Sequence, residues 1–302
     1  MAAAPAELRR AQPLLGTFVE IAASGAPGDV EAAIEAAFGT IARVRRLMSF
    51  HEPESDVSRL NRAAGANAVA VDPWTFEVLE AAVDLGRRSA GAFDVSVAPV
   101  LQAMGRLPRH GDGESAELAP GRGPAIELMA GHTVRLRDAR VRIDLGGIAK
   151  GYAVDRAVAV LVQCGAAQGV VNAGGDLKVF GPRPQAIHLR DPRDPRVILD
   201  RVEIARGALA SSGGRADPVH SWQADTPCVI DPSRATPADT IAGASVMAAS
   251  CMIADALTKI VMIRGEAAGA LLAELGAAAL LVSAEGQVSA SRDWPGAASH
   301  AA

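Results

Sequence analysis

Residues 140–162 constrain the fold more than any other part of the chain. Apolar and polar residues alternate as far as Leu145, which is the period of a half-buried strand. Gly146 and Gly147 end this alternation and allow the backbone to approach a bound group closely. From Ile148 onward the apolar residues fall on one face of a helix. The segment therefore predicts a strand, a glycine turn and a helix in direct succession.

The start of that helix is a candidate anion-binding site. Free backbone N–H groups and the positive end of the helix dipole suit a phosphate. Lys150 adds a full charge, and Asp144 can accept from a sugar hydroxyl, a ring N–H or a water on a metal. An ordinary junction with a solvated Lys150 explains the same residues, so this segment alone leaves both interpretations open. The spacing matches neither a Walker loop nor the G-x-G-x-x-G fingerprint.

The composition excludes some classes of protein. At 302 residues, 49% of them apolar, the chain can build one large domain or two small ones. A net charge of −4 gives no reason to expect a nucleic-acid partner. No run of about 20 apolar residues predicts a membrane span. The first residues lack the apolar core of a secretory signal, so we expect a cytoplasmic protein, or a periplasmic one if an export signal was removed. The sequence predicts no oligomeric state.

The three cysteines are odd in number and scattered along the chain. They predict neither a disulfide framework nor a zinc site. Cys164 and Cys251 lie in apolar runs, and we expect both to be small core residues.

Strand and helix patterns alternate irregularly, with hairpins among them. Helices are predicted at 29–47, 56–62, 72–88, 148–162, 251–264 and 266–275, strands at 17–22, 132–136, 140–145, 170–171, 186–189, 201–210, 245–248 and 278–282, and a loop at 105–124. This order favours an α+β fold, a mixed and largely antiparallel sheet with packed helices, over a doubly wound sheet. We expect one domain at 12–286, with 1–11 and 287–302 as terminal extensions that can be disordered.

Eight further short motifs follow one another along the chain. They are Leu15-Gly-Thr-Phe18, Met48-Ser49, Ser55-x-x-Ser-Arg-Leu-Asn61, Gly91-Ala-Phe-Asp94 with Pro99, Asn172-x-Gly-Gly-Asp176, Ser211-Ser-Gly213, Ile230-Asp-Pro232 and Ala254-Asp-Ala-Leu257. Each motif alone is weak. In this order, together with Asp144–Lys150, they resemble the ApbE-type FAD:protein FMN transferase (flavin transferase) family over nearly the whole chain.

The resemblance implies an enzyme that uses FAD as donor substrate together with Mg²⁺. It would move FMN onto a threonine or serine hydroxyl of a target flavoprotein and release AMP. Such chemistry needs the pyrophosphate charge neutralised, the attacking oxygen aligned and its proton removed, and a metal on the phosphates serves the first two needs. An FAD pyrophosphatase and a non-catalytic flavin-binding protein are the alternatives.

Position by position, the resemblance also implies the site residues. The cofactor contacts would be Leu15, His51, Ala92, Phe93, Asp94, Asp144, Lys150, Asn172, Gly174, Gly175 and Ile230. The metal ligands would be the Gly147 carbonyl, Asp255 and Thr258, and the catalytic residues Asp255, Lys259 and Cys228. Core packing explains Phe93 equally well, a capping role explains Asp94, and a bare hairpin corner explains residues 172–175. An aspartate buried in so apolar a helix as that of Asp255 is costly unless it is paired or metal-bound.

The chain departs from the family pattern near Asp255. The family tends to have a threonine four residues after this aspartate, where this chain has Lys259, and Thr258 comes one residue earlier. Both positions lie on the aspartate's face of a helix. Either Thr258 still reaches the metal, or the Lys259 ammonium pairs with Asp255 and takes over part of the cation's role. In the second case magnesium dependence would be weak or absent.

Three further departures divide between the two ends of the cofactor. Cys228 replaces a histidine that assists proton transfer in the family, and a thiol of pKa ~8.5 is mostly protonated at neutral pH. This change and the one at Lys259 lie at the phosphate end. His51 replaces a stacking tyrosine and Leu15 a methionine, and both of these lie at the flavin end.

Overall fold

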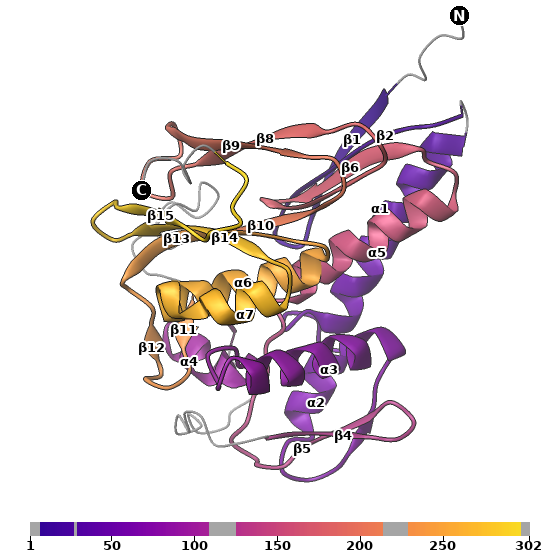
Figure 1. The fold of residues 1–302 in the computed structure, drawn as a ribbon. Helices are drawn as coiled ribbons and strands as arrows, with labels where there is room; N and C mark the ends of the chain where they lie inside the picture. Colours follow the sequence, from indigo (N-terminus) through magenta and orange to yellow (C-terminus); the bar gives the residue numbers. More distant parts are fainter. Residues whose placement is uncertain (1–6, 27–28, 109–124, 214–228, 297–302) are drawn as a thin grey trace, which may run out of the picture.

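An antiparallel sheet of eight strands organises the fold (Figure 1). The structure is a computed structural model that describes residues 7–26, 29–108, 125–213 and 229–296. The strand order is β1-β2-β6-β7-β10-β13-β14-β15, and each neighbouring pair runs antiparallel. The strands span β1 Glu7–Leu14, β2 Thr17–Ser24, β6 Gln168–Ala173, β7 Asp176–Phe180, β10 Gly207–Gly213, β13 Ile241–Ala248, β14 Ala278–Ser283 and β15 Val288–Ala290.

Three long helices build the large core on one face of this sheet. Helix α6 (Cys251–Arg264) packs against β10 and β13, α5 (Ala149–Gln163) against β6 and β7, and α1 (Asp29–Met48) against α5. Helices α5 and α6 also contact each other, and the candidate site lies at this contact. The other helices are α2 Asp56–Arg62, α3 Pro73–Arg88, η1 Val95–Val97, α4 Ala98–Ala103, η3 Gly265–Ala268 and α7 Gly269–Glu274.

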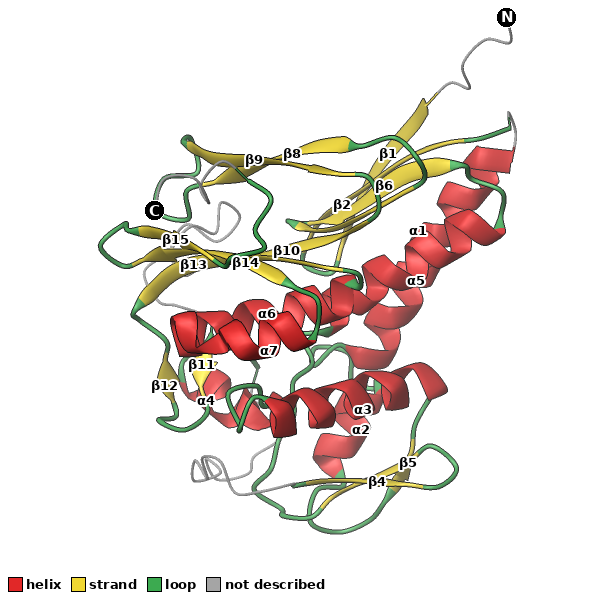
Figure 2. Cartoon of the chain, in the orientation of Figure 1, coloured by secondary structure: helices red, strands yellow, loops and turns green. Residues whose placement is uncertain are grey.

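The hairpin of β8 (Gln185–Arg190) and β9 (Ile198–Ile204) covers the other face of the sheet (Figure 2). A second apolar cluster fills the space between the hairpin and the sheet, with Val202 and Ile204 packed near Leu177 and Leu280. Two small sheets complete the described structure, β3 (Val69–Ala70), β5 (Thr133–Leu136) and β4 (Ile126–Met129) in one and β11 (Ile230–Asp231) and β12 (Thr236–Pro237) in the other. The mixed helix and antiparallel sheet content confirms the predicted α+β class.

The helices predicted from periodicity are confirmed with small shifts of their ends. Asp72 caps α3 as expected, since its Oδ1 accepts a hydrogen bond from the Trp74 N–H at 2.9 Å. The predicted helix at 266–275 is split into η3 and α7. Of the loop expected at 105–124, residues 109–124 lie outside the described ranges. No helix in the described ranges is both long and apolar enough to cross a membrane.

The strand predicted at Arg140–Leu145 is wrong. Residues 141–145 are not assigned to a strand, because a side chain takes the place of a neighbouring strand. The buried Asn61 amide donates to the Ile143 carbonyl at 2.9 Å and its Oδ1 accepts the Ile143 N–H at 2.8 Å. The Asp144 N–H donates to the Val95 carbonyl at 2.8 Å. The alternation of apolar and polar residues correctly indicates an extended backbone. It does not indicate which groups form hydrogen bonds with that backbone.

Three other expectations also need correction. The strand predicted at Arg201–Ala210 is two strands in different sheets, β9 and β10, and β10 begins at Gly207, whose φ is 143°. Cys164 is exposed because it caps the C-terminus of α5, whereas Cys251 is buried as expected. Parts of the expected terminal extensions belong to the sheet, since β1 begins at Glu7 and β15 ends at Ala290.

Asn61→Ala should destabilise the fold through the segment that carries Asp144. The substitution leaves the buried N–H and carbonyl of Ile143 without partners, and each such group costs about 1–3 kcal/mol. We expect urea denaturation to give a free energy of unfolding lower by at least about 2 kcal/mol. Asn67→Ala is the matched control, since Asn67 is exposed, and it should change stability by less than about 0.5 kcal/mol. Equal losses in the two variants would contradict the assigned role.

Candidate active site

The site is built where the first turn of α5 lies against the start of α6. Gly151 allows this approach, because a Cβ added there would lie 2.2 Å from the Cys251 carbonyl oxygen. The Gly151 N–H donates to Asp255 Oδ2 at 3.1 Å. Asp255 on α6 is fully buried, and because it accepts this N–H its carboxylate faces the positive end of the α5 dipole. One N–H that the sequence offered to a phosphate is thus committed to an aspartate of the protein.

Lys259 supplies the counter-charge to Asp255 from one turn further along α6. Its ammonium forms an ion pair with Asp255 Oδ1 and also donates to the Asp255 carbonyl oxygen at 3.0 Å. Both carboxylate oxygens of Asp255 therefore accept hydrogen bonds from the protein itself. The Lys259 side chain retains 17% of its exposure, whereas that of Asp255 retains none.

Thr258 is buried and turns toward the sheet. Its hydroxyl lies 2.7 Å from the Ser212 hydroxyl on β10 and donates to the Asp255 carbonyl at 2.7 Å. In the structure Lys259, and not Thr258, therefore faces the Asp255 carboxylate, and a role of Lys259 in place of a metal stays a prediction.

A second ion pair joins α5 to the sheet. Lys150 Nζ lies 2.5 Å from Oδ2 of Asp176, which is 1% exposed and begins β7. The other oxygen of Asp176 is buried and has no hydrogen-bond partner among the described residues. Burial lowers the pKa of Lys150, but attraction by Asp176 and Asp255 outweighs this effect and the net pKa is raised. Lys150 is therefore charged at neutral pH.

Lys150, Asp176, Asp255 and Lys259 form one group, which we call the charge cluster. Asp255 acts electrostatically on both Lys150 and Asp176, and Lys259 acts on Asp176. Burial raises the pKa of Asp176, and the neighbouring Lys150 opposes this rise. The two ammonium and two carboxylate charges balance when all four groups are ionised. The residues at 150 and 255, far apart in sequence, thus share one site.

Asp155 fixes the start of α6 relative to α5. Its carboxylate accepts hydrogen bonds from the Ser250 hydroxyl at 2.7 Å, the Cys251 N–H at 3.1 Å and the Met252 N–H at 2.9 Å. It also pairs with Lys178 of β7 at 2.6 Å. The three bonds from Ser250, Cys251 and Met252 hold the first turn of α6, so they also set the position of Asp255 on its second turn.

Two tight hairpin turns lie side by side at one end of the sheet. The β1–β2 turn holds Leu15 and Gly16 at φ of 54° and 72°, and the β6–β7 turn holds Gly174 and Gly175 at 66° and 102°. A Cβ added to Gly174 would lie 2.6 Å from Thr17 Oγ1, so only glycine allows the two turns to meet. Asp176 directly follows the second turn.

Asn172 stabilises the β6–β7 turn, as expected if residues 172–175 form a hairpin corner. Its Oδ1 accepts the Gly175 N–H at 2.9 Å. The structure thus brings Leu15, Asn172, Gly174 and Gly175 together beside the charge cluster. Their contact with a cofactor stays a prediction.

The predicted flavin segment packs close to the glycine turn. Phe93 Cε2 and Lys259 Cε lie 3.8 Å and 3.5 Å from the position of a Cβ added to Gly147. Ala92 and Phe93 belong to the large core, each 5% exposed. Asp94 caps η1, since its Oδ1 accepts the N–H and the hydroxyl of Ser96 at 2.8 Å and 2.7 Å. The packing and capping roles are thus both observed, and flavin contacts remain predictions.

Asp144 lies at the other side of the glycine turn. Its Oδ2 accepts the Gly146 N–H at 3.1 Å. Burial raises the pKa of the Asp144 carboxyl, although the Gly146 N–H and the nearby His51 oppose the rise. His51 itself is exposed in the turn after α1.

Of the remaining predicted site residues, one lies apart from this group and one falls outside the described ranges. Ile230 is buried in a separate apolar cluster with Val100 and Leu101 of α4. Cys228 lies outside the described residues.

Three residues of the site were missed by the sequence reasoning. Asp176, Asp155 and Ser212 each contact a predicted residue or hold the helix that carries it. Asp176 had a usable signal, because it stands between a two-glycine turn and the apolar run of a strand. Ser212 had one as well, because it is the middle residue of the Ser211-Ser-Gly213 motif, whereas no pattern set Asp155 apart from an ordinary polar residue of a helix.

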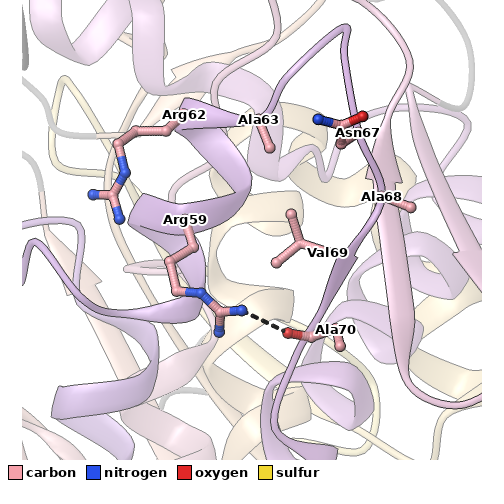
Figure 3. A pocket seen from close by; sticks show the side chains of 7 residues that line it. All are labelled: Arg59, Arg62, Ala63, Asn67, Ala68, Val69 and Ala70. Atoms are coloured by element: carbon pink, nitrogen blue, oxygen red, sulfur yellow. Dashed lines mark hydrogen bonds between the residues drawn. The ribbon is translucent and has the colours of Figure 1, made fainter.

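A hollow of about 470 Å³ beside α2 contains none of the residues of the charge cluster (Figure 3). The guanidinium of Arg59 donates to the Ala70 carbonyl at 3.1 Å and pairs with Asp56 at 2.8 Å. Arg62 donates to the Pro53 carbonyl at 2.5 Å. Since both cations already have protein acceptors, we assign no ligand to this hollow. Among the described residues, no group of three or more His, Cys, Asp or Glu side chains is arranged to hold a metal ion.

Comparisons with known proteins agree on one family. The sequence matches the profile of the ApbE family over residues 15–281. It is 31% identical over 269 residues to the FAD:protein FMN transferase of Rhodobacter capsulatus, covering 84% of this chain and 50% of that protein. It is 28% identical over 243 residues to the FAD:protein FMN transferase of Vibrio cholerae, covering 76% of this chain and 73% of that protein. The chain thus spans only half the length of the Rhodobacter relative.

Solved structures show the same fold. The crystal structure of the ApbE protein of Thermotoga maritima superposes with a TM-score of 0.84 at 28% identity, covering 95% of this chain and 97% of that one. The flavin transferase ApbE of Vibrio cholerae superposes with a TM-score of 0.80 at 24% identity, which supports the fold alone. With the family profile matched over most of its length, this chain belongs to the ApbE family.

Proposed function

We propose that this protein is an FAD:protein FMN transferase. The charge cluster carries the proposal, because two fixed ammonium groups lie beside the glycine turn that begins α5. A pyrophosphate bears negative charge that such groups neutralise through charge-assisted hydrogen bonds. The relatives named FAD:protein FMN transferase support the same activity.

The reaction exchanges the phosphoanhydride bond of FAD for a phosphate ester bond to the acceptor. An acceptor hydroxyl oxygen attacks the phosphorus of the FMN half, and the bond from that phosphorus to the bridging oxygen breaks. AMP leaves with the bridging oxygen, and the proton of the hydroxyl is released. We assign the acceptor hydroxyl to a threonine or serine of a target flavoprotein. The cytoplasmic location of the protein stays a prediction.

Lys150 and Lys259 have the main roles at the phosphates. Their ammonium groups neutralise the charge that develops as AMP departs, which is worth most in a site closed to water. Asp176 and Asp255 hold the two lysines in place. Asp144 accepts a hydrogen bond from the ribityl chain or the flavin ring, and Leu15, Phe93 and the two hairpin turns border the flavin end.

The predicted magnesium ion does not fit the residues near Asp255 as they are arranged. Mg²⁺ takes about six oxygen ligands in a near-octahedral shell. Both oxygens of Asp255 already accept hydrogen bonds, one of them from an ammonium group. The hydroxyl of Thr258 is committed to Ser212 and the Asp255 carbonyl. We therefore route no step of the reaction through a metal.

The activity can be tested with FAD and a flavoprotein domain that contains an acceptor threonine. We expect AMP, read by chromatography, and covalently bound FMN, read by mass spectrometry of the acceptor, to form in equal amounts. Neither should form without the acceptor. AMP release without an acceptor would indicate a pyrophosphatase instead. Bound FAD without either product would indicate a flavin-binding protein.

Lys150→Ala should weaken FAD binding about 10- to 100-fold, since a hydrogen bond to a charged group contributes about 1.5–3 kcal/mol. Lys150→Arg should recover part of the affinity because it keeps the charge. Isothermal titration calorimetry measures the dissociation constants, and circular dichroism checks that each variant is folded. Lys178→Ala is the matched control, as Lys178 also pairs with an aspartate and lies outside the charge cluster. An equal loss of affinity in the control would refute the role of Lys150.

A further inference from the structure

We propose that Lys259 is a tethered cation which takes the place of a divalent metal ion at Asp255, so that FAD binds without magnesium. The part of the proposal that concerns FAD rests on the proposed function. The part that concerns the cation rests on contacts within α6 and α5 alone.

The Lys259 ammonium contacts oxygen atoms of the kind that a metal cation would contact. Its ammonium lies against the carboxylate and the carbonyl oxygen of the same residue, Asp255. The lysine stem passes Gly147, where Cε and Cδ lie 3.5 Å and 3.8 Å from the position of an added Cβ. An added Cβ at position 147 would thus be in ordinary van der Waals contact with this side chain, so the lysine stem lies directly against the glycine turn.

The carboxylates of the charge cluster are already neutralised without a further cation. Asp255 has its counter-charge in Lys259, and Asp176 has its counter-charge in Lys150. A divalent ion at Asp255 would face the Lys259 ammonium within direct contact distance, and like charges in a buried site repel strongly. To bind there, the ion would have to expel the lysine from an ion pair whose carboxylate is fully buried.

Neither Thr258 nor Asp176 offers a better place for a metal ion. The Thr258 hydroxyl points to Ser212 on the sheet. The free oxygen of Asp176 belongs to a carboxylate that feels both Lys150 and Lys259. A metal at that oxygen would meet the same two ammonium groups.

An ammonium can also serve the phosphates. It carries three N–H donors, and two of the described acceptors of Lys259 belong to Asp255. A third donor is left for a phosphate oxygen. Lys150 and Lys259 together supply two positive charges, the same charge that one magnesium ion would bring.

Binding of Mn²⁺ in the absence of FAD tests the tethered cation directly. Electron paramagnetic resonance counts free Mn²⁺ in titrations of the wild-type protein and of Lys259→Thr. We expect the wild type to bind no Mn²⁺ in the micromolar range, and Lys259→Thr to bind one ion at least tenfold more tightly than the wild type. Lys178→Thr is the matched control, because it also removes an ammonium from an aspartate, and it should bind no better than the wild type.

One tightly bound Mn²⁺ per wild-type molecule, displaced by Mg²⁺, would overturn the proposal. So would equal Mn²⁺ binding by Lys259→Thr and Lys178→Thr in folded samples. The wild-type titration needs no variant, so the proposal stays testable even if Lys259→Thr does not fold.

FAD affinity supplies a second measurement, by quenching of flavin fluorescence in Mg²⁺ and in EDTA. We expect the wild-type dissociation constants in the two buffers to agree within about threefold, well under one factor of ten in affinity. A wild-type affinity at least tenfold higher in Mg²⁺ would refute the tethered cation and leave the transferase activity standing. Absence of AMP in both buffers, with no Mn²⁺ bound, would instead refute the activity and leave the tethered cation standing.

Discussion

The burial of the Asp255 carboxylate is the constraint on which the rest of the site depends. A fully buried charge is costly unless it is paired and hydrogen-bonded. Asp255 meets this need with a backbone N–H from α5 and an ammonium from its own helix. The N–H is within reach only because Gly151 lets α5 touch the first turn of α6. The same contact fixes the direction in which α5 leaves the glycine turn, and with it the place of Lys150.

Much of this arrangement could be predicted from local sequence patterns. Apolar periodicity located the helices, and the glycine pair located the turn before α5. The apolar surroundings of Asp255 correctly indicated that its carboxylate needs a partner. Helical spacing offered Thr258 and Lys259 as partners and could not choose between them, because both lie on the same face of α6. Packing against the sheet decides, since Ser212 of β10 bonds the Thr258 hydroxyl and only Lys259 remains beside the carboxylate.

What could not be predicted depends on contacts between distant segments. The alternation at residues 140–145 is that of a strand, yet its backbone groups bind the side chain of Asn61 from α2. The sequence left Lys150 open between a phosphate contact and a solvated side chain, and its partner Asp176 comes from a strand that follows a separate turn. No periodicity records such pairs, because each residue obeys its local pattern while the partner is set by how sheet and helices pack.

The charge cluster also determines how a ligand can enter the site. A bare metal site would hold two buried carboxylates with no counter-charge until the ion arrived, which is costly for folding. Here the ammonium groups are part of the chain, so the cluster is neutral before any ligand binds. Incoming phosphates must then share each ammonium with a carboxylate. The attraction per cation is weaker than that of a free divalent ion, but the donors are already in position and need no ordering when the ligand binds. A tethered lysine therefore attracts the phosphates less strongly than a divalent ion would, but it is preorganised. This arrangement suits a site that has to stay assembled without a metal.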